Sequence, residues 1–404
     1  MLRFGRDSRS AEPWLSPPRL RTLAEEGAEG ERHASWLELF FDLVFVVAIA
    51  ELSHELVVNH TLGGFATFAA LFVPVFVAWQ GFSFYADRFD TDDVLFRVSM
   101  LIAMLAVAAL AIQIPSVAHG ASTGFALAYV AIRSLTVALN LRAYRHVSLA
   151  RPLIGRYVVA FSFSVALWTV SLAVPEPWRF LLWGIGLAAD LGVPALIGPR
   201  FVGRVPIHAS HIPERFALFT IIVLGESVVA VALGVADSHW KFSSALGAVL
   251  GFLTVACLWW TYFDVGAGLA LKAGPWTAVR FIYVHVPMWA SLTAVAAGVN
   301  LLIEEASSAS LDAGVRWALC GGAAVYLCCV SLIQGATARG IVPAIVGIRI
   351  SAVGLLISLL LFGAGLRPVT FATLMLAILV ALVAFEISRN LRSDAPPSPK
   401  PSTE

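Results

Sequence analysis

The stretch LELFFDLVFVVAIAELSHEL, residues 37–56, is as long as a helix that crosses a bilayer, because about 20 apolar residues span the hydrocarbon core. It nevertheless carries four carboxylates and an imidazole, from Glu38, Asp42, Glu51, Glu55 and His54. Ionisable groups are costly in lipid, so they face protein or water and take partners there. The stretch therefore predicts a membrane helix with a polar role for part of its surface.

The composition of the whole chain also indicates a membrane protein. Of the 404 residues, 59% are hydrophobic and 13% are charged, whereas about 25% are charged in soluble domains. Lipid offers no hydrogen-bond partners to an open backbone, and the apolar segments are too long for the strands of a membrane barrel. The predicted fold class is all-α, a polytopic transmembrane helix bundle.

Apolar segments of about 20 residues recur along almost the whole chain, each ended by charged residues, Pro or Gly. They predict twelve spans, at 36–57, 63–84, 94–113, 122–140, 153–174, 178–198, 216–236, 243–263, 281–303, 315–334, 341–362 and 369–388. The bundle thus covers residues 36–388. A largely disordered cytoplasmic segment, 1–35, is predicted before it, and a disordered cytoplasmic tail, 389–404, after it.

The basic residues predict the orientation of these spans. With the N-terminus inside, 21 of the 27 Lys and Arg residues lie on the cytoplasmic side, where membrane proteins carry their excess of positive charge. The opposite side has Arg179, Lys241, Arg316 and Arg367. Both termini are therefore predicted to be cytoplasmic. A net charge of +1 gives no electrostatic reason to expect nucleic acid as a partner.

Few ionisable residues lie deep inside the predicted spans. Counted from the cytoplasmic ends, six of them come out about 7–15 Å deep, and these are Asp42, Arg133, Asp190, Glu226, His285 and Arg349. They are expected to form one polar layer in which the two Arg residues neutralise two of the three carboxylates. A carboxylic acid left over in apolar surroundings can exchange a proton near neutral pH, as proton-coupled carriers require.

Structural alternatives stand beside this interpretation. Asp42 and Glu51 could belong to static ion pairs that fix helix packing, and Glu38 and Glu55, near the span ends, are expected to be solvated. A lone membrane His is more often a satisfied donor between helices than a proton relay. Glu226 is the main titrating candidate, because IIVLGESVV, residues 221–229, surrounds it with apolar residues, and Gly225 is expected to let another helix approach. The proton-coupling and polar-layer candidates are Glu226, Asp42, Glu51, His54, Arg133, Asp190, His285 and Arg349.

Four motifs carry a family resemblance: ELFFDLVFVVAIAELSH (38–54), DRFDTDD (87–93), HIPERFALFTIIVLGESVVAV (211–231) and WWTYFD (259–264). Over about residues 33–390 the chain resembles the bacterial low-temperature-requirement A family of polytopic membrane proteins. The resemblance implies a multi-spanning protein, and the family name records growth in the cold rather than a reaction. The family's recurrent polar positions match Glu38, Asp42, His54, Asp87, Arg88, Asp90, Asp92, Asp93, Glu214, Arg215, Glu226 and Asp264. Pro213 departs from the pattern, which leaves the start of the seventh span open.

The turn ADRFDTDDVLF, residues 86–96, joins the second and third predicted spans. Thr91 or Asp92 could cap the third span, and Asp93 suits the positive end of its dipole. Alternatively the turn is a gate whose charged groups exchange partners between Arg97 and the loop before span seven. The cytoplasmic gate candidates are Asp87, Arg88, Asp90, Asp92, Asp93, Glu214, Arg215 and Asp264.

A possible internal repeat would change the mechanism that the sequence implies. Glu51 precedes Asp90 by 39 residues, and Glu226 precedes Asp264 by 38. This spacing suggests two six-helix halves of the same orientation, an architecture that some secondary transporters use.

The function expected is a proton-coupled secondary transporter or permease for an unknown small solute, with membrane lipid and protons as its other partners. The alternatives are an intramembrane enzyme that acts on lipid or a lipid-linked substrate, and a sensor or scaffold that responds to the state of the bilayer. No nucleotide-binding Gly-rich loop or recognisable catalytic motif occurs, so an enzyme is not favoured. No cofactor and no metal are expected, and the sequence specifies no oligomeric state.

Overall fold

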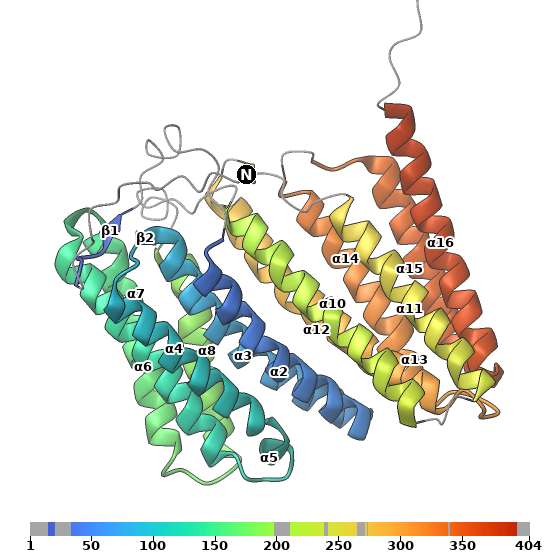
Figure 1. The fold of residues 1–404 in the computed structure, drawn as a ribbon, viewed down its shortest axis with the longest axis horizontal. Helices are drawn as coiled ribbons and strands as arrows, with labels where there is room; N and C mark the ends of the chain where they lie inside the picture. Colours follow the sequence, from blue (N-terminus) through green and yellow to red (C-terminus); the bar gives the residue numbers. More distant parts are fainter. Residues whose placement is uncertain are drawn as a thin grey trace, which may run out of the picture. The chain divides into compact units, whose positions relative to one another are not determined.

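The computed structural model describes residues 15–20, 34–197, 211–237, 241–264, 271–272, 274–337 and 340–393. These residues form long helices and one short pair of strands (Figure 1). The chain divides into two compact units. Unit 1 holds the described residues of Met1–Glu55, Gly64–Ile222 and Ala270–Val279, and unit 2 those of Leu56–Gly63, Val223–Leu269 and Arg280–Glu404.

The first part of the chain contains β1 (Arg19–Leu20), α2 (Trp36–Val58), α3 (Leu62–Arg88), β2 (Phe89–Asp90), α4 (Val94–Ile112), α5 (Ile114–Ala118), α6 (Thr123–His146), η1 (Ser148–Ala150), α7 (Arg151–Ser171) and α8 (Trp178–Ile197). The second part contains α10 (His211–Asp237), α11 (Phe242–Phe263), α12 (Pro275–Glu304), α13 (Ala313–Arg316), the π-helical turn η2 (Trp317–Gly321), α14 (Gly322–Gln334), α15 (Pro343–Phe362), η3 (Gly363–Gly365) and α16 (Pro368–Ser393).

Each of the twelve predicted spans coincides with a helix, or with the continuous run of α13, η2 and α14. Ten helices in the described part of the chain are long and apolar enough to cross a membrane. The chain is thus a multi-pass, all-helical membrane protein apart from the strand pair. α2 and α8 are outside these ten, and α2 carries four carboxylates within its 23 residues. The count of twelve spans stays a prediction, and segments 1–14, 21–33 and 394–404 lie outside the described residues.

Three helices near the site begin at the residues described next, and side chains cap two of them. Ser35 and Glu38 form a capping box at α2, since Ser35 N donates to Glu38 Oε2 (2.8 Å) and Glu38 N donates to Ser35 Oγ (3.3 Å). α4 is capped by Asp93, whose Oδ1 accepts from Phe96 N at 3.0 Å, rather than by Thr91 or Asp92. α10 begins at His211, five residues before the predicted span, and includes Pro213 in its first turn.

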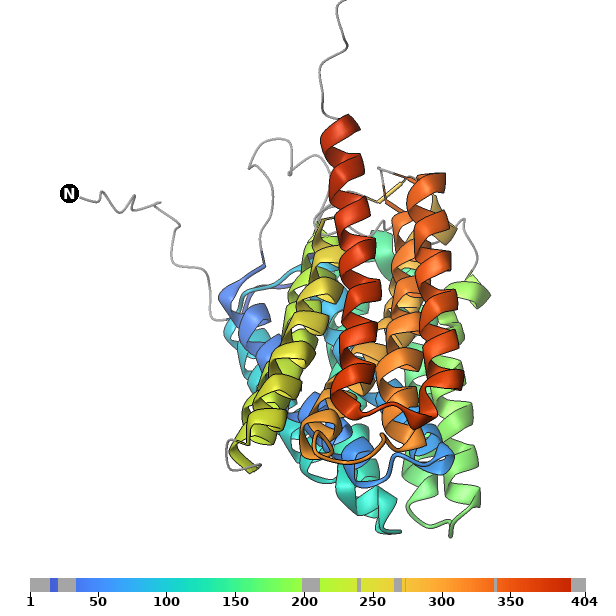
Figure 2. The same cartoon turned by 90° about the vertical axis from the view of Figure 1, so that its right-hand side faces the viewer.

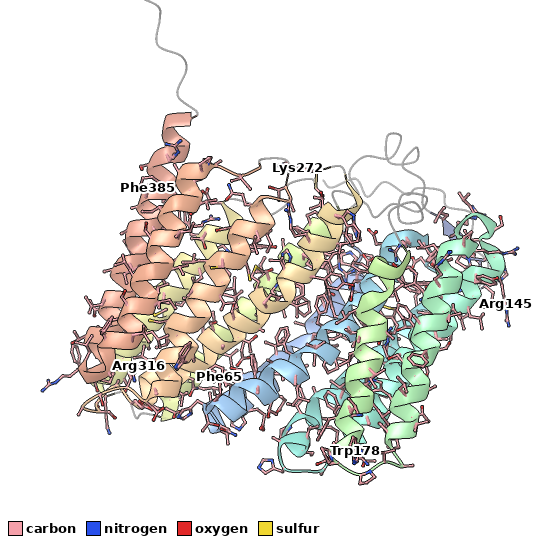
Figure 3. The ribbon with its side chains drawn as sticks, turned by 180° about the vertical axis from the view of Figure 1, so that it is seen from behind. Phe65, Arg145, Trp178, Lys272, Arg316 and Phe385 are labelled. Carbon is pink, nitrogen blue, oxygen red and sulfur yellow. The ribbon has the colours of Figure 1, made fainter. Side chains whose placement is uncertain are left out.

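In unit 1, α6 packs between α4 and α7, and α7 packs on α8 (Figure 1). Aromatic rings fill this packing, with Trp168 stacked on Trp183 at 4.4 Å between ring centroids. Figure 3 places Trp178 and Arg145 at opposite ends of these helices. The predicted topology assigns those ends to opposite sides of the membrane.

The turn between α3 and α4 is covered by a short segment from the N-terminal region. β1 pairs with β2 in antiparallel register, Arg19 opposite Asp90 and Leu20 opposite Phe89. Arg142 of α6 donates to Ser16 O at 2.6 Å and also bonds the Asp93 carboxylate. The segment 15–20 is therefore tied to the turn by both backbone and side-chain bonds.

In unit 2, α16 packs against α11 and α15, and α15 also packs against α14 (Figure 2). Gly322 lets α14 approach α12 closely, because a Cβ at this position would lie 2.9 Å from Val295 Cγ2 and 3.0 Å from Ser291 O. Figure 3 places Arg316 and Phe385 at opposite ends of these helices. The core of unit 2 is thus a set of long, closely packed helices.

Candidate functional site

Five ionisable residues of unit 1 meet where α2 and α10 begin and α3 ends. They are Glu38 and Asp42 of α2, Asp87 of α3, and His211 and Arg215 of α10, named here the three-helix cluster. All five side chains are buried. Helical spacing brings them together, because Glu38 and Asp42, like His211 and Arg215, are four residues apart and share one face of their helix. The prediction that Glu38 is solvated was wrong, since its side chain is directed into this cluster.

Arg215 links two of the carboxylates in the three-helix cluster. Its Nη2 lies 2.6 Å from Asp42 Oδ1, and its Nη1 lies 3.5 Å from Glu38 Oε1. The same Nη2 donates to Ser83 Oγ of α3 at 3.2 Å. One guanidinium therefore holds α2, α3 and α10 together at this end of unit 1.

Asp42 has a second donor in Trp79, whose Nε1 lies 2.7 Å from Asp42 Oδ1. Trp79 in turn packs against Phe216 and Phe219 of α10, at 5.0 and 4.7 Å between ring centroids. Phe41 of α2 packs on further rings of the same core. The Asp42–Arg215 pair is thus enclosed by aromatic side chains, which exclude water and strengthen its electrostatic attraction.

His211 lies between the other two carboxylates of the three-helix cluster. Its Nδ1 is 2.9 Å from Asp87 Oδ1, and its Nε2 is 3.8 Å from Glu38 Oε2. An ionised Asp87 only accepts hydrogen bonds, so Nδ1 is the donor in that state. A second proton at Nε2 in this geometry would make the ring cationic and attract Glu38.

A family match covers most of the sequence and includes the motifs that contain these residues. Residues 33–385 match the family model described as Bacterial low temperature requirement A protein (LtrA). The chain belongs to this family. It is also similar to the uncharacterized protein RA0937 of Rhizobium meliloti (strain 1021), with 28% identity over 301 residues that cover 68% of this chain and 73% of the relative. Every residue of the three-helix cluster lies within the matched LtrA region.

Two other predicted polar-layer residues of this LtrA chain, Arg133 and Asp190, form an ion pair of their own within unit 1. Arg133 pairs with Asp190, with Nη2 2.6 Å from Oδ1. Asp190 also accepts from Tyr129 OH at 3.1 Å and from Ser164 Oγ at 2.9 Å. This site joins α6, α7 and α8 inside unit 1, and its carboxylate is fully supplied with donors. The predicted pairing of Arg133 with an acid was correct, and its geometry suits a static tie.

Arg349 forms a similar tie in unit 2, but not with any of the predicted partners. Its Nε lies 2.7 Å from Glu386 Oε1 of α16. Its Nη1 donates to Gln334 Oε1 at 3.1 Å, and its Nη2 lies 3.5 Å from Thr261 O. Arg349 thus joins α11, α14, α15 and α16. The pairing with Asp42, Asp190 or Glu226 was wrong because Glu386, near the end of the last predicted span, had been left out of the buried charges.

His285 and Glu226 are both buried in unit 2. His285 Nδ1 lies 2.6 Å from Phe281 O, and its Nε2 lies 3.0 Å from Tyr262 OH. Because both nitrogens have neutral partners, this geometry suits a structural His. At Gly225 an added Cβ would meet no described atom within 4 Å, so the expected close approach of another helix at that position was wrong.

The far end of α2 is less enclosed than its start. Glu51 and Glu55 are half-buried, and His54 is exposed. The structure therefore brings the first-motif residues Glu38 and Asp42 into the cluster, but not His54.

The gate candidates of the α3–α4 turn separate into several pairs. Asp92 pairs with Arg97 at 2.7 Å, and Asp93 bonds Arg142. Arg88 Nη2 donates to Tyr157 OH at 3.3 Å. Among the described side chains of the turn motif, the one bonded to the start of α10 is that of Asp87, through His211.

The remaining gate candidates lie outside the three-helix cluster. Glu214 is half-buried beside Arg215, and Asp264 is exposed at the end of α11. Asp90 lies in β2, and its side chain is outside the described part of the chain.

Sequence reasoning missed Trp79, Ser83 and His211 as members of the site. His211 opens the motif at 211–231, but it is not among the polar-layer or gate candidates predicted from the sequence. Trp79, Ser83 and Asp87 are spaced four residues apart along α3. That spacing places them on one helix face, and it is the feature of the sequence that could have identified them as part of the site.

Proposed function

We propose that this LtrA-family protein is a proton-coupled secondary transporter for a small solute, and that the three-helix cluster couples protonation to the position of the start of α10. The observation that carries the proposal is the buried imidazole of His211 between Asp87 and Glu38, at 2.9 and 3.8 Å. Imidazole is the side chain that ordinarily changes charge between about pH 5 and 8. A transporter driven by a proton gradient needs a group of this kind.

The same protein offers a contrast between static and titratable charge. The Arg133–Asp190 and Arg349–Glu386 pairs each oppose one permanent cation to one carboxylate. Pairs of this kind suffice to hold helices together. The three-helix cluster adds an imidazole and two further carboxylates to such a pair. A group that titrates is unnecessary for a static tie, so its presence supports a role for a proton.

The proposed cycle has two states of the cluster. With His211 protonated on both nitrogens, Asp87 and Glu38 both attract it, and α10 is held against α2 and α3. Loss of the Nε2 proton removes the attraction to Glu38 and weakens this closure. Arg215 remains charged throughout and keeps Asp42 paired, so the change is confined to the His211 side. Switches of this kind act through a local charge change on an element with two positions.

The proposal includes the wider architecture predicted from the sequence. It places twelve spans in the bacterial cytoplasmic membrane, with both termini and the three-helix cluster on the cytoplasmic side, and a disordered segment at each end. It also includes two six-helix halves of the same orientation. Glu226 stays a candidate for a second titrating group, on the part of α10 that belongs to unit 2.

Proton movement that depends on an added solute tests the function directly. The purified protein is reconstituted into liposomes that contain a pH-sensitive dye, and solutes are presented one class at a time. We expect at least one class to evoke proton movement in wild-type vesicles and not in empty ones. His211→Gln is expected to bind the solute yet lose the proton movement, because glutamine keeps hydrogen bonds but cannot titrate in this range.

The control is Asp92→Asn with Arg97→Gln, which removes an exposed ion pair on the neighbouring turn and should leave solute-evoked proton movement unchanged. Solute uptake that persists without any proton movement would contradict proton coupling. Folded, correctly oriented protein that moves no solute would contradict transport altogether. Release of a cleaved lipid product under the same conditions would favour the enzyme alternative.

A further inference from the structure

The segment 15–20 of unit 1, named here the N-terminal strap, is attached to the rest of the unit at both of its ends. At one end, β1 pairs with β2 of the α3–α4 turn (Figure 1). At the other end, Ser16 O accepts a hydrogen bond from Arg142 Nη2 of α6 at 2.6 Å. Pro18, between these two attachments in the sequence, is buried. The strap thus joins the α3–α4 turn to α6.

The strap and α6 together hold the turn before and after its loop. Phe89, which lies opposite Leu20 in the strand pair, packs on Tyr85 of α3 at 5.0 Å between ring centroids. After the loop, Arg142 bonds the carboxylate of Asp93, which caps α4. The same guanidinium group therefore bonds both the strap and the start of α4. Release of the strap would free β2 from its strand partner and take from Arg142 its bond to the strap.

The turn held in this way follows directly on the part of α3 that belongs to the three-helix cluster. Asp87 is two residues before β2, and its Oδ1 lies 2.9 Å from His211 Nδ1 of α10. Arg88, the residue between Asp87 and β2, donates through Nη2 to Tyr157 OH of α7 at 3.3 Å. A displacement of β2 is therefore separated by a single residue from the contact between α3 and α10.

Two features make the closed arrangement easy to open. β1 and β2 are each two residues long, so few backbone bonds hold the strap to the turn. Arg88 is 8% exposed, and within the described part of the chain its Nε has no hydrogen-bond partner. A buried donor without a partner costs free energy that contact with water returns. Opening of the turn would admit water to this guanidinium group and so offset part of the loss of the strap contacts.

We propose that the N-terminal strap controls the three-helix cluster. While it is bound, the strap keeps Asp87 against the start of α10, and its release lets α10 move away from α3. A short segment that binds or leaves is one of the known ways in which proteins switch between two states. This inference rests on the proposed function, because it names the element that limits the movement of α10.

A reversible disulfide between the strap and β2 tests this control. Arg19→Cys with Asp90→Cys, in a background without the four cysteines of the sequence, joins two opposed residues of the strand pair. The Cα atoms of such partners lie about 4.5–5.5 Å apart, within the range that a disulfide spans. Hydrogen exchange of the amides of Phe216–Thr220 is measured in detergent, without solute or a proton gradient. We expect oxidation to slow this exchange by at least about tenfold and reduction to restore it, because these amides exchange when α10 opens locally.

The single variant Asp90→Cys, treated with the same oxidant, should exchange at an unchanged rate. Leu20→Cys with Phe89→Cys, the other opposed pair, serves if the first disulfide does not form. Equal exchange of Phe216–Thr220 in the oxidised and reduced protein would overturn the proposal. A protein that moves no solute, yet exchanges more slowly on oxidation, would contradict transport and still support control of α10 by the strap.

Discussion

At the scale of single residues, Asp42 and Arg215 are expected to be the most costly members of the three-helix cluster to remove. Both are nearly inaccessible to solvent, and their charged atoms lie 2.6 Å apart. Removing Arg215 leaves Asp42 as an uncompensated buried charge, which costs about 3–5 kcal/mol. Arg215→Ala should lower the unfolding free energy in detergent by about this amount, and Asp42→Ala by less, because Arg215 keeps its contact with Glu38 at 3.5 Å.

The double variant Asp42→Ala and Arg215→Ala is expected to lose less than the sum of the two single losses, because no Asp42 carboxylate is then left without its guanidinium. The exposed Asp92–Arg97 pair, at 2.7 Å, provides a control with the same chemistry. Its removal should change stability by at most about 1 kcal/mol. Additive losses at Asp42 and Arg215 would show that the two charges do not depend on one another.

At this scale the sequence predicted which charged residues are buried, but not all of their partners. Asp42, Asp190, Arg133 and Arg349 were correctly expected to be buried, because apolar neighbours on both sides place a charge inside a span. The partners could not be derived in the same way. Whether Arg349 meets Glu226 or Glu386 depends on which helices are neighbours. The hydrophobic periodicity of a single span does not indicate which helices pack against it.

At the scale of elements, two glycines allow a matched comparison within long helices. At Gly81 of α3, an added Cβ would lie 2.8 Å from Arg133 Nη1 and 3.2 Å from Thr136 Cγ2, whereas at Gly225 of α10 it would meet nothing described within 4 Å. Gly81→Ala should therefore displace the Arg133 side chain and cost about 1–3 kcal/mol.

Gly225→Ala is expected to be neutral or to stabilise by up to about 1 kcal/mol, through the lower backbone entropy of alanine in a helix. Unfolding midpoints of the two purified variants measure the difference. A Gly225→Ala protein as unstable as Gly81→Ala would mean that the open space at Gly225 is filled by another part of the protein.

The ends of elements show where sequence reasoning succeeded and failed. Apolar length located every long helix in the described part of the chain, but the start of α10 was placed at 216 because Pro213 suggested a break. Proline is tolerated in the first turn of a helix, where its missing N–H has no partner. The helix begins at His211. As a consequence Arg215, counted from sequence as a loop cation, is a buried residue of the site.

At the scale of the whole molecule, the distribution of basic residues predicts which helix ends share a side of the membrane. Single cysteines at Asp92 and His119, in a background without Cys257, Cys320, Cys328 and Cys329, test this at the two ends of the segment that contains α4 and α5. Both positions are exposed. A membrane-impermeant thiol reagent added to intact cells should label the cysteine at His119 and not the one at Asp92.

The matched experiment on inverted membrane vesicles should reverse that labelling pattern. Labelling of both positions from the same side would remove α4 as a crossing helix. Labelling of the Asp92 position from outside would invert the topology, and it would place the three-helix cluster at the outer face of the membrane.

The distance along the chain between Asp42 and Arg215 has a consequence for how the protein is made. The two residues are 173 positions apart, so a ribosome that adds about 5–20 residues per second reaches Arg215 roughly 9–35 s after Asp42. During that interval α2 has been synthesised, but the guanidinium that pairs with Asp42 does not yet exist. We expect α2 in nascent chains arrested before Arg215 to stay crosslinked to the insertion machinery, and to leave it in chains arrested after α10 has emerged. Equal crosslinking in both would mean that α2 enters lipid without its partner. Assembly of the site then sets the order of membrane insertion, and α2, the first helix in the described part of the chain, is among the last to settle.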